Sequence, residues 1–170
     1  MVTDQMMIQR SQSSDVNSLV AKLEMVLCEE LSAGTASVKK LANGIVHIVI
    51  QGELLFFAGD DARLSPAGKA LLSKFAPLLR ALETGQKVHV RCYDSRGAGL
   101  KGRQAFVECW KSTGWCSSHV VRYFLWEHQL YFLDFRAEGH SRAEPLVPHD
   151  ALLAKLNRRI EICIEPAGGI

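Results

Sequence analysis

The sequence predicts an α+β fold in which helices cover one face of a mixed β-sheet, with a further helix at the N-terminus. Three observations support this prediction. Segments with apolar residues at three- and four-residue steps alternate along the chain with short segments rich in β-branched residues. The pair Asn43-Gly44 separates two apolar runs, which is the sequence signal of a β-hairpin. Strands that alternate with helices after a hairpin favour a mixed sheet with its helices on one side.

The first predicted element is an amphipathic helix over residues 14–34, preceded by a polar stretch, residues 1–13, that we expect to be flexible. Ser14 is placed to cap this helix and Gly34 to end it. Its apolar stripe consists of Val16, Leu19, Val20, Leu23, Val26, Leu27 and Leu31. We expect the stripe to pack on the core of the following domain, residues 35–170, or to form the contact in a homodimer.

That domain is predicted to begin with a hairpin of two strands, 37–41 and 45–50. The second strand is apolar on both faces apart from His47, which indicates a central position in the sheet. A helix then starts at Ser65-Pro66 and ends at Gly85. The remaining predicted elements are a strand at 88–92, a glycine-rich loop at 97–102, a helical stretch at 103–127 with or without a break near 112–114, a strand at 130–137, a short helix at 150–156 and a strand at 159–165.

Composition limits the classes of function. The formal net charge is only +2 and no basic run exceeds two residues, which argues against a dedicated nucleic-acid-binding protein. No apolar stretch reaches the roughly 18 to 20 residues that span a bilayer, and the first residues show no signal-peptide pattern. The five cysteines form no Cys-x-x-Cys pair, which excludes a zinc ribbon or a thioredoxin motif; their simplest role is as buried small apolar residues.

Five stretches between residues 38 and 165 resemble the C-terminal domains of OmpA and MotB. The most specific is Asn157-Arg158-Arg159-Ile160-Glu161-Ile162, which is similar to the Asn-Arg-Arg-Val-Glu-Ile ending of that family. Residues 109–125 resemble the stator-protein pattern Asn-Trp-x-Leu-Ser-x-x-Arg-Ala-x-x-Val-Val-x-Phe-Leu. Residues 54–65 resemble the lead into the first shared helix, 88–95 the strand that runs into Gly-His-Thr-Asp, and 139–145 the motif Gly-x-Gly-x-x-x-Pro.

The resemblance implies an OmpA-like β/α/β/α/β sandwich that binds peptidoglycan and is not an enzyme. The family's ligand is the diaminopimelate end of the stem peptide, whose ammonium needs an acid and whose carboxylate needs a guanidinium. Asp94 stands at the family's acidic position, whereas Cys116 stands at the arginine position. The candidate ligand-binding residues are therefore Tyr93, Asp94, Ser95, Cys116 and Arg158. Loss of such a charge-assisted contact costs about 2 to 5 kcal/mol in a desolvated site.

Two functions are possible for a site that keeps the family's acid, Asp94, but has Cys116 in place of the family's arginine. Without a substitute for the arginine, we expect a structural or interaction module of an envelope complex, such as a stator or a secretion system, in which peptidoglycan binding is weak or lost. With a guanidinium from Arg91, Arg96 or Arg158, we expect a working anchor with a rebuilt pocket. Asp94 has an ordinary alternative role as a cap of the loop after its strand. The resemblance also implies other envelope proteins or a second copy as partners, and a periplasmic location with attachment to a membrane through a segment outside this sequence.

A third alternative belongs to a different class. Cys116 and His119 share a helix face, and together with Cys92 and Asp94 they could ligate zinc or form a Cys-His-Asp nucleophile. Isolated cysteines and histidines on a helix usually serve in packing or lie at the surface. We therefore expect neither a cofactor nor a metal, and we expect the other histidines, His47 among them, to be structural or exposed.

Overall fold

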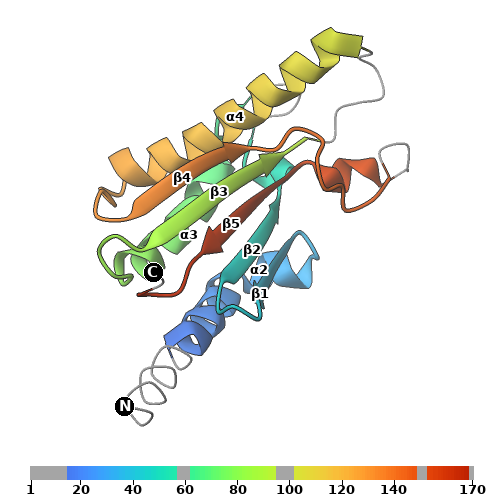
Figure 1. Ribbon diagram of the computed structural model, residues 1–170. Helices are drawn as coiled ribbons and strands as arrows, with labels where there is room; N and C mark the ends of the chain where they lie inside the picture. Colours follow the sequence, from blue (N-terminus) through green and yellow to red (C-terminus); the bar gives the residue numbers. More distant parts are fainter. Residues whose placement is uncertain (1–14, 57–61, 95–101, 149–152, 169–170) are drawn as a thin grey trace.

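The computed structural model describes residues 15–56, 62–94, 102–148 and 153–168, and these form a five-stranded mixed sheet with helices behind it (Figure 1). The order of the strands is β1-β2-β5-β3-β4. All neighbours are antiparallel except β3 and β4, which are parallel. The strands are β1 (Ala36–Lys40), β2 (Val46–Gln51), β3 (Lys87–Tyr93), β4 (Asp134–Gly139) and β5 (Arg159–Ile164).

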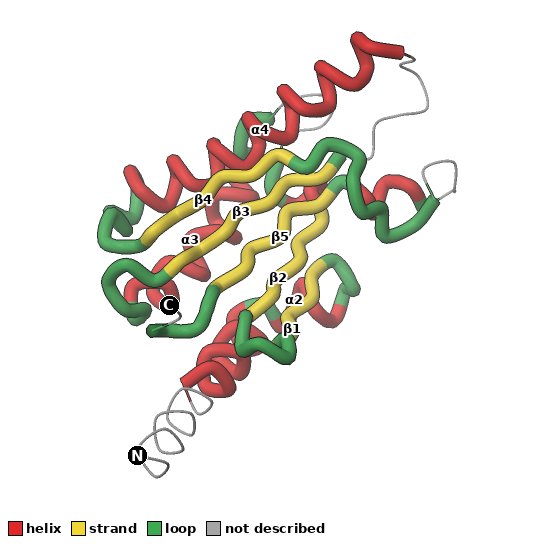
Figure 2. The backbone as a smooth tube through the Cα atoms, viewed as in Figure 1, coloured by secondary structure: helices red, strands yellow, loops and turns green. Residues whose placement is uncertain are grey.

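The helices lie on one face of this sheet and leave the other face uncovered, as Figure 2 shows. This arrangement confirms the predicted fold class. The described part of the N-terminal helix covers residues 15–26. It is followed by α2 (Cys28–Ser32), the 3₁₀ turn η1 (Gly52–Leu54), α3 (Pro66–Arg80), α4 (Gly102–Trp126) and the 3₁₀ turn η2 (Ala154–Asn157). No described helix is both long and apolar enough to cross a membrane.

Alternation along the strands separates an apolar face from a polar one. Side chains that point toward the helices form the core, and in β2 and β5 these are Val46, Ile48, Ile50, Ile160, Ile162 and Ile164. The intervening positions face the uncovered side and carry charged or polar groups, among them His47 and Glu161. β2 lies between β1 and β5, which confirms that it is a central strand. Gly44 adopts a positive φ of 80° in the hairpin turn, as the Asn-Gly pair predicts.

The N-terminal helix packs on the core of its own chain. Leu23 and Leu27 are buried in the core cluster, and Leu19, Val20 and Val26 contact it. Gly34, with a φ of +69°, ends the helical region as predicted. Ser14, the predicted cap, lies outside the described residues. Of the two roles expected for the apolar stripe, the structure shows packing within the chain.

The start of α3 follows the predicted pattern. The Ser65 hydroxyl accepts a hydrogen bond from the Gly68 amide at 2.9 Å, and Pro66 occupies the first turn. A Cβ atom at Gly68 would clash with the Leu55 carbonyl, so only glycine allows η1 to pack against the helix here. The helix ends at Arg80, and Gly85, at a φ of +80°, lies in the turn that leads into β3.

Three predicted boundaries are wrong. The helix expected to end at Gly85 ends at Arg80. α4 is continuous through residues 112–114, where the sequence left a break open. Gly139 allows β4 to approach this part of α4, because a Cβ atom at Gly139 would lie 2.7 Å from the Gly114 nitrogen. β4 begins at Asp134 rather than at residue 130, since Leu130 and Leu133 are buried in the preceding turn. The described part of the predicted helix 150–156 is the 3₁₀ turn Ala154–Asn157. Most of the predicted glycine-rich loop lies outside the described residues.

Candidate functional site

The predicted binding residues meet where β3 ends and β5 begins. Asp94 follows β3, Arg158 precedes β5, and Cys116 lies in the middle of α4. All three line one cavity, and its remaining walls are Gly52, Phe56, Cys92, Tyr93, Ser112, Thr113 and Arg159. The correspondence of Asp94 and Cys116 with the two clamp positions is thus spatial as well as sequential. The volume of the cavity is only about 10 Å³, roughly that of a single water probe.

Asp94 is tightly placed by the polypeptide around it. Its side chain is buried, with 3% of the residue surface exposed. Its amide donates a hydrogen bond to the Ser141 carbonyl at 2.7 Å, and the Ser141 amide donates to the Thr113 hydroxyl at 3.1 Å. Thr113 in turn donates to the Cys109 carbonyl of its own helix at 2.9 Å. The acid is therefore fixed between β3, the turn after β4 and α4.

Cys116 supplies a thiol where the family pattern has a guanidinium. It is buried and adjoins the thiol of Cys92, which also lines the cavity. Burial raises the pKa of Cys92 well above its ordinary value, and a hydrogen bond with Cys116 and the nearby Asp94 charge act in the same direction. The Arg158 charge opposes this change. A neutral thiol at these positions cannot bind a carboxylate as an arginine does.

Of the two described arginines considered as substitutes, Arg91 and Arg158, the second lies at the cavity. Its guanidinium forms no hydrogen bond or ion pair with the described residues. Arg91 points to the uncovered face of the sheet, where its Nε donates to Glu138 Oε2 at 3.1 Å. Arg96 and the predicted site residue Ser95 lie outside the described part of the chain. Arg158 is thus a described cation that lines the same cavity as Asp94 and whose guanidinium has no hydrogen-bond partner among the described residues.

Tyr93 lines the cavity and is held in place by three neighbours. The Arg159 guanidinium lies 3.7 Å from the centre of its ring, and the His140 ring stacks on it at 4.8 Å. Its hydroxyl donates to Glu144 at 3.4 Å. Burial is the main cause that raises the pKa of Tyr93, and the charges of Glu161 and Glu144 add to it. Arg159 was not among the residues predicted for the site. It lines the cavity and packs on the Tyr93 ring.

The zinc or nucleophile site considered for Cys92, Asp94, Cys116 and His119 does not form. Cys116 faces the cavity, whereas a ring nitrogen of His119 donates to the Ala62 carbonyl at 2.8 Å and lines a different pocket. These four residues are all described, and they do not converge within ligand distance of one another. The spacing of three residues placed Cys116 and His119 on neighbouring rather than identical helix faces.

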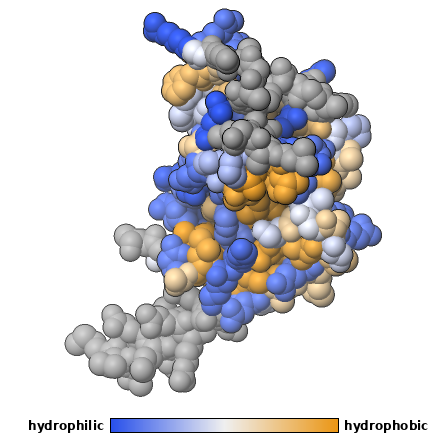
Figure 3. All heavy atoms as spheres, turned by 90° about the vertical axis from the view of Figure 1, so that its right-hand side faces the viewer, coloured by the Kyte–Doolittle hydropathy of each residue, from blue (hydrophilic) through white to orange (hydrophobic). Residues whose placement is uncertain are grey.

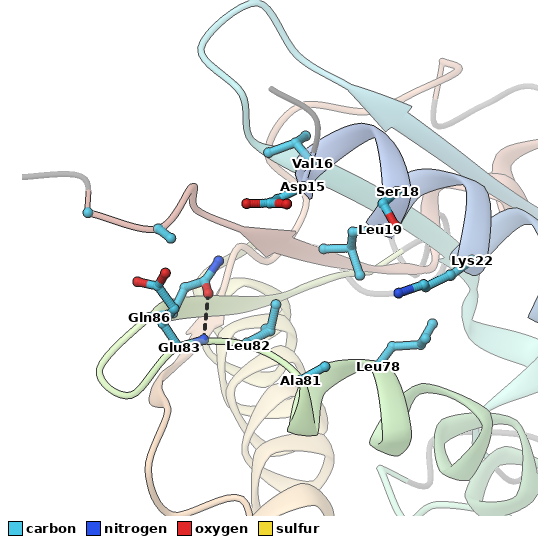
Figure 4. Close-up of a pocket in the computed structure, with 12 residues that line it drawn as sticks. Asp15, Val16, Ser18, Leu19, Lys22, Leu78, Ala81, Leu82, Glu83 and Gln86 are labelled. Atoms are coloured by element: carbon cyan, nitrogen blue, oxygen red, sulfur yellow. Dashed lines mark hydrogen bonds between the residues drawn. The ribbon is translucent and has the colours of Figure 1, made fainter. Parts of the chain in front are cut away.

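A second cavity, of about 450 Å³, lies between the N-terminal helix and the end of α3 (Figure 4). Leu19 faces Leu78 and Leu82 across it, and charged side chains such as Lys22 and Glu83 stand at its rim. None of the predicted site residues lines this cavity. Figure 3 shows the face that forms the right-hand side of Figure 1, and there an apolar area is bordered by hydrophilic residues.

The fold matches solved structures although no family model and no curated protein matches the sequence. A MotB-like protein from Desulfovibrio vulgaris shares 20% identity over 95% of this chain and 98% of its own, with a TM-score of 0.72. The cell wall anchor of the T6SS from Pseudomonas aeruginosa shares 23% identity over 85% and 96% of the two chains, with a TM-score of 0.69. The periplasmic domain of Helicobacter pylori MotB shares 15% identity over 78% and 89%, with a TM-score of 0.61.

The sheet order, the helices on one face and these similarities define a domain with the fold of the OmpA and MotB C-terminal domains. The resemblance stated from the sequence is thereby confirmed. The similar structures that extend over most of this chain include a MotB-like protein and a T6SS cell wall anchor. The N-terminal helix is included in the match to the MotB-like protein, which covers 95% of this chain.

Proposed function

We propose that this chain is a non-enzymatic cell-envelope domain whose peptidoglycan site is degenerate and which acts as a structural or interaction module of an envelope complex. The observation that carries the proposal is the composition and size of the cavity that contains Asp94 and Cys116. Asp94 is retained, the arginine position is a buried thiol, and the space between them holds about 10 Å³. Sites for small ligands usually enclose about 300 to 1,000 Å³. The cavity is too small for a diaminopimelate group, and Cys116 offers no guanidinium for its carboxylate.

The proposal includes a periplasmic location and attachment to a membrane through a segment outside this sequence. Solved structures similar to this chain include a periplasmic MotB domain and a T6SS cell wall anchor, and these support it. The lack of convergence between Cys116 and His119 supports the non-enzymatic role, because a nucleophile needs its base within hydrogen-bond reach.

The surface of α4 supports the role as an interaction module. All three tryptophans of the chain, Trp110, Trp115 and Trp126, are exposed on this helix, together with Phe106 and Val107. Aromatic residues of this kind are enriched at protein interfaces. If the partner is a second copy of the chain, light scattering will give twice the monomer mass, and Phe106→Ser together with Trp110→Ser will lower it.

A working anchor with a rebuilt pocket is the second candidate, and Arg158 favours it. This guanidinium lines the same cavity as Asp94 and forms no hydrogen bond or ion pair with the described residues. It could therefore take the ligand carboxylate while Asp94 takes the ammonium. The pocket would have to enlarge before a ligand entered.

Co-sedimentation with purified peptidoglycan sacculi separates the two candidates. The samples are the wild type, Asp94→Ala, Arg158→Ala and Arg136→Ala, which removes an exposed arginine from the far part of β4. A related domain that keeps both the acid and the arginine serves as the positive control. The degenerate-site proposal predicts that this chain stays in the supernatant while the positive control pellets.

The rebuilt pocket predicts a different pattern. The wild type and Arg136→Ala would pellet, whereas Asp94→Ala and Arg158→Ala would each lose most of the binding, since removal of one charge partner costs about 2 to 5 kcal/mol, roughly thirtyfold to several thousandfold in affinity. Equal pelleting of all four proteins would contradict both candidates, because the binding surface would then lie elsewhere.

A further inference from the structure

Strand register brings two histidines to either side of one cysteine on the uncovered face of the sheet. Cys163 of β5 pairs with His47 of β2 and with His89 of β3. Glu161 lies two residues before Cys163 and therefore on the same face. His47 was expected to have no ligand spacing. The sequence separates it from Cys163 by more than a hundred residues, and only the pairing of β2 with β5 places the two together.

The donor atoms of His47, Glu161 and Cys163 lie within 4.8 Å of one another. The His47 Nε2 and Glu161 Oε2 atoms are 3.0 Å apart. The other carboxylate oxygen, Oε1, accepts a hydrogen bond from Arg159 Nε at 2.7 Å. Arg159 thus orients the carboxylate and leaves Oε2 directed at His47 and Cys163, as outer partners of metal ligands do.

The Cys163 thiol is the unusual member of this group. It is 4% exposed, and it forms no hydrogen bond with the described residues. Its surroundings are polar, because the charges of Arg91, Glu161 and Glu138 act on it. A buried sulfur directed at an imidazole and a carboxylate is the donor set of a transition-metal site.

We propose that His47, Glu161 and Cys163 bind one Zn²⁺ ion on the uncovered face of the sheet, with water as the fourth ligand. Zinc bonds of about 2.3 Å to sulfur and about 2.0 to 2.2 Å to nitrogen and oxygen require the Cys163 sulfur to approach the other two donors by up to about 1 Å. Side-chain rotation supplies this movement. The His47 and Glu161 donors, 3.0 Å apart, are already close enough. On binding, the thiol loses its proton to solvent and the His47 nitrogen exchanges its contact with Glu161 for the metal.

The donors select among metals. A thiolate with an imidazole suits zinc, whereas magnesium and calcium take oxygen ligands. His89 stays outside the coordination shell, because Glu138 and Glu165 hold its two ring nitrogens at 2.6 and 2.8 Å. The site is separate from the Asp94 cavity, whose lining shares none of the three ligands. It is therefore independent of the peptidoglycan proposal.

The test uses the full chain, reduced and stripped of metal, titrated with Zn²⁺ by calorimetry and with Co²⁺ as a spectroscopic probe. The wild type is expected to bind one equivalent and to show a sulfur-to-cobalt charge-transfer band. Cys163→Ser should abolish that band and weaken zinc binding at least about tenfold, since even outer partners of a metal cost ten- to a hundredfold. His47→Gln should weaken it similarly while keeping a hydrogen bond to Glu161.

The matched control is Cys28→Ser, which removes an exposed thiol in α2. It should bind zinc as the wild type does. Circular dichroism establishes that each variant is folded. No zinc uptake by the reduced wild type would overturn the proposal. Zinc uptake that neither Cys163→Ser nor His47→Gln changes would overturn it as well, because the ion would then occupy another site.

Discussion

The guanidinium of Arg159 lies 3.7 Å from the centre of the Tyr93 ring, on the uncovered face of the sheet. Arg159 is 3% exposed and also donates to Glu161 at 2.7 Å and to the Glu144 carbonyl at 3.0 Å. One buried cation therefore connects the start of β5, the end of β3 and the loop after β4. The second arginine of the Asn-Arg-Arg stretch is structural, whereas the first, Arg158, lines the Asp94 cavity.

Arg159→Ala is expected to destabilise the fold by about 3 to 5 kcal/mol, because it removes the guanidinium partner of Oε1 from the buried Glu161 carboxylate. Urea unfolding measures the change. The control Arg136→Ala breaks an exposed pair with Asp134 and should change the free energy of unfolding by no more than about 1 kcal/mol. Equal effects of the two substitutions would show that Arg159 does not hold these segments together.

The close approach of β4 to α4 gives a second prediction. A Cβ atom at Gly139 would lie 2.7 Å from the Gly114 nitrogen and 2.9 Å from the Thr113 hydroxyl, so Gly139→Ala should cost about 1 to 3 kcal/mol of stability. A Cβ atom at Gly114 would meet open space within the helix. Gly114→Ala should therefore stabilise the protein by about 0.5 to 1 kcal/mol. Thermal unfolding should move in opposite directions for the two variants, and a fall for both would contradict this account.

Local chemistry allowed much of the fold to be predicted. Asn43-Gly44, Ser65-Pro66 and Gly34 act through backbone geometry within a few residues, and the structure has the turn, the helix start and the helix end at these positions. A break near residues 112–114, which the sequence left open, does not occur, and the sequence did not predict the close contact of Gly139 with the helix backbone at Gly114. A single sequence contains no local signal for such a contact.

In the candidate site, too, local motifs located some residues, whereas others depend on the three-dimensional fold. Asp94 and Cys116 were located by motif and lie together as expected. The sequence could not choose among Arg91, Arg96 and Arg158, because the choice between the two described ones depends on which face of the sheet each side chain occupies. Tyr93 was assigned to the ligand because of its position beside Asp94, and it lines the same cavity. The packing of Arg159 and His140 on its ring was not predicted from the sequence. His47 and Cys163 are joined by register alone.

Packing of the N-terminal helix on the core is tested by a pair of substitutions. Leu27 is 0% exposed and Met25 is 68% exposed. Leu27→Ala should cost about 2 to 5 kcal/mol through the cavity that it leaves, whereas Met25→Ala should change the stability by about 0.5 kcal/mol or less. Chemical unfolding followed by circular dichroism provides the measurement. If Leu27→Ala proved neutral, the helix would not belong to the same cooperative unit as the sheet.

Acid should weaken the fold through Glu138. Partial burial acts to raise the pKa of this carboxyl, but hydrogen bonds from His89 and His140 and the charge of Arg91 outweigh it and lower the pKa to about 2 from an ordinary value of 4.5. A group whose pKa is lower in the folded state stabilises the protein above the unfolded value and loses that effect as the pH falls toward the folded value. The stability should therefore decrease between about pH 5 and pH 2.

Glu138→Gln should remove about 2 kcal/mol of this pH-dependent stability, an amount that already allows for solvent screening of a carboxylate whose side chain is 30% exposed. The measurement is the free energy of unfolding in urea at intervals across this pH range, in the presence of a chelator so that bound metal does not contribute. The control is Glu108→Gln, which changes an exposed glutamate on α4. Glu108→Gln should keep the wild-type slope of stability against pH, and a Glu138→Gln slope as steep as the wild type would refute the role given to this carboxylate.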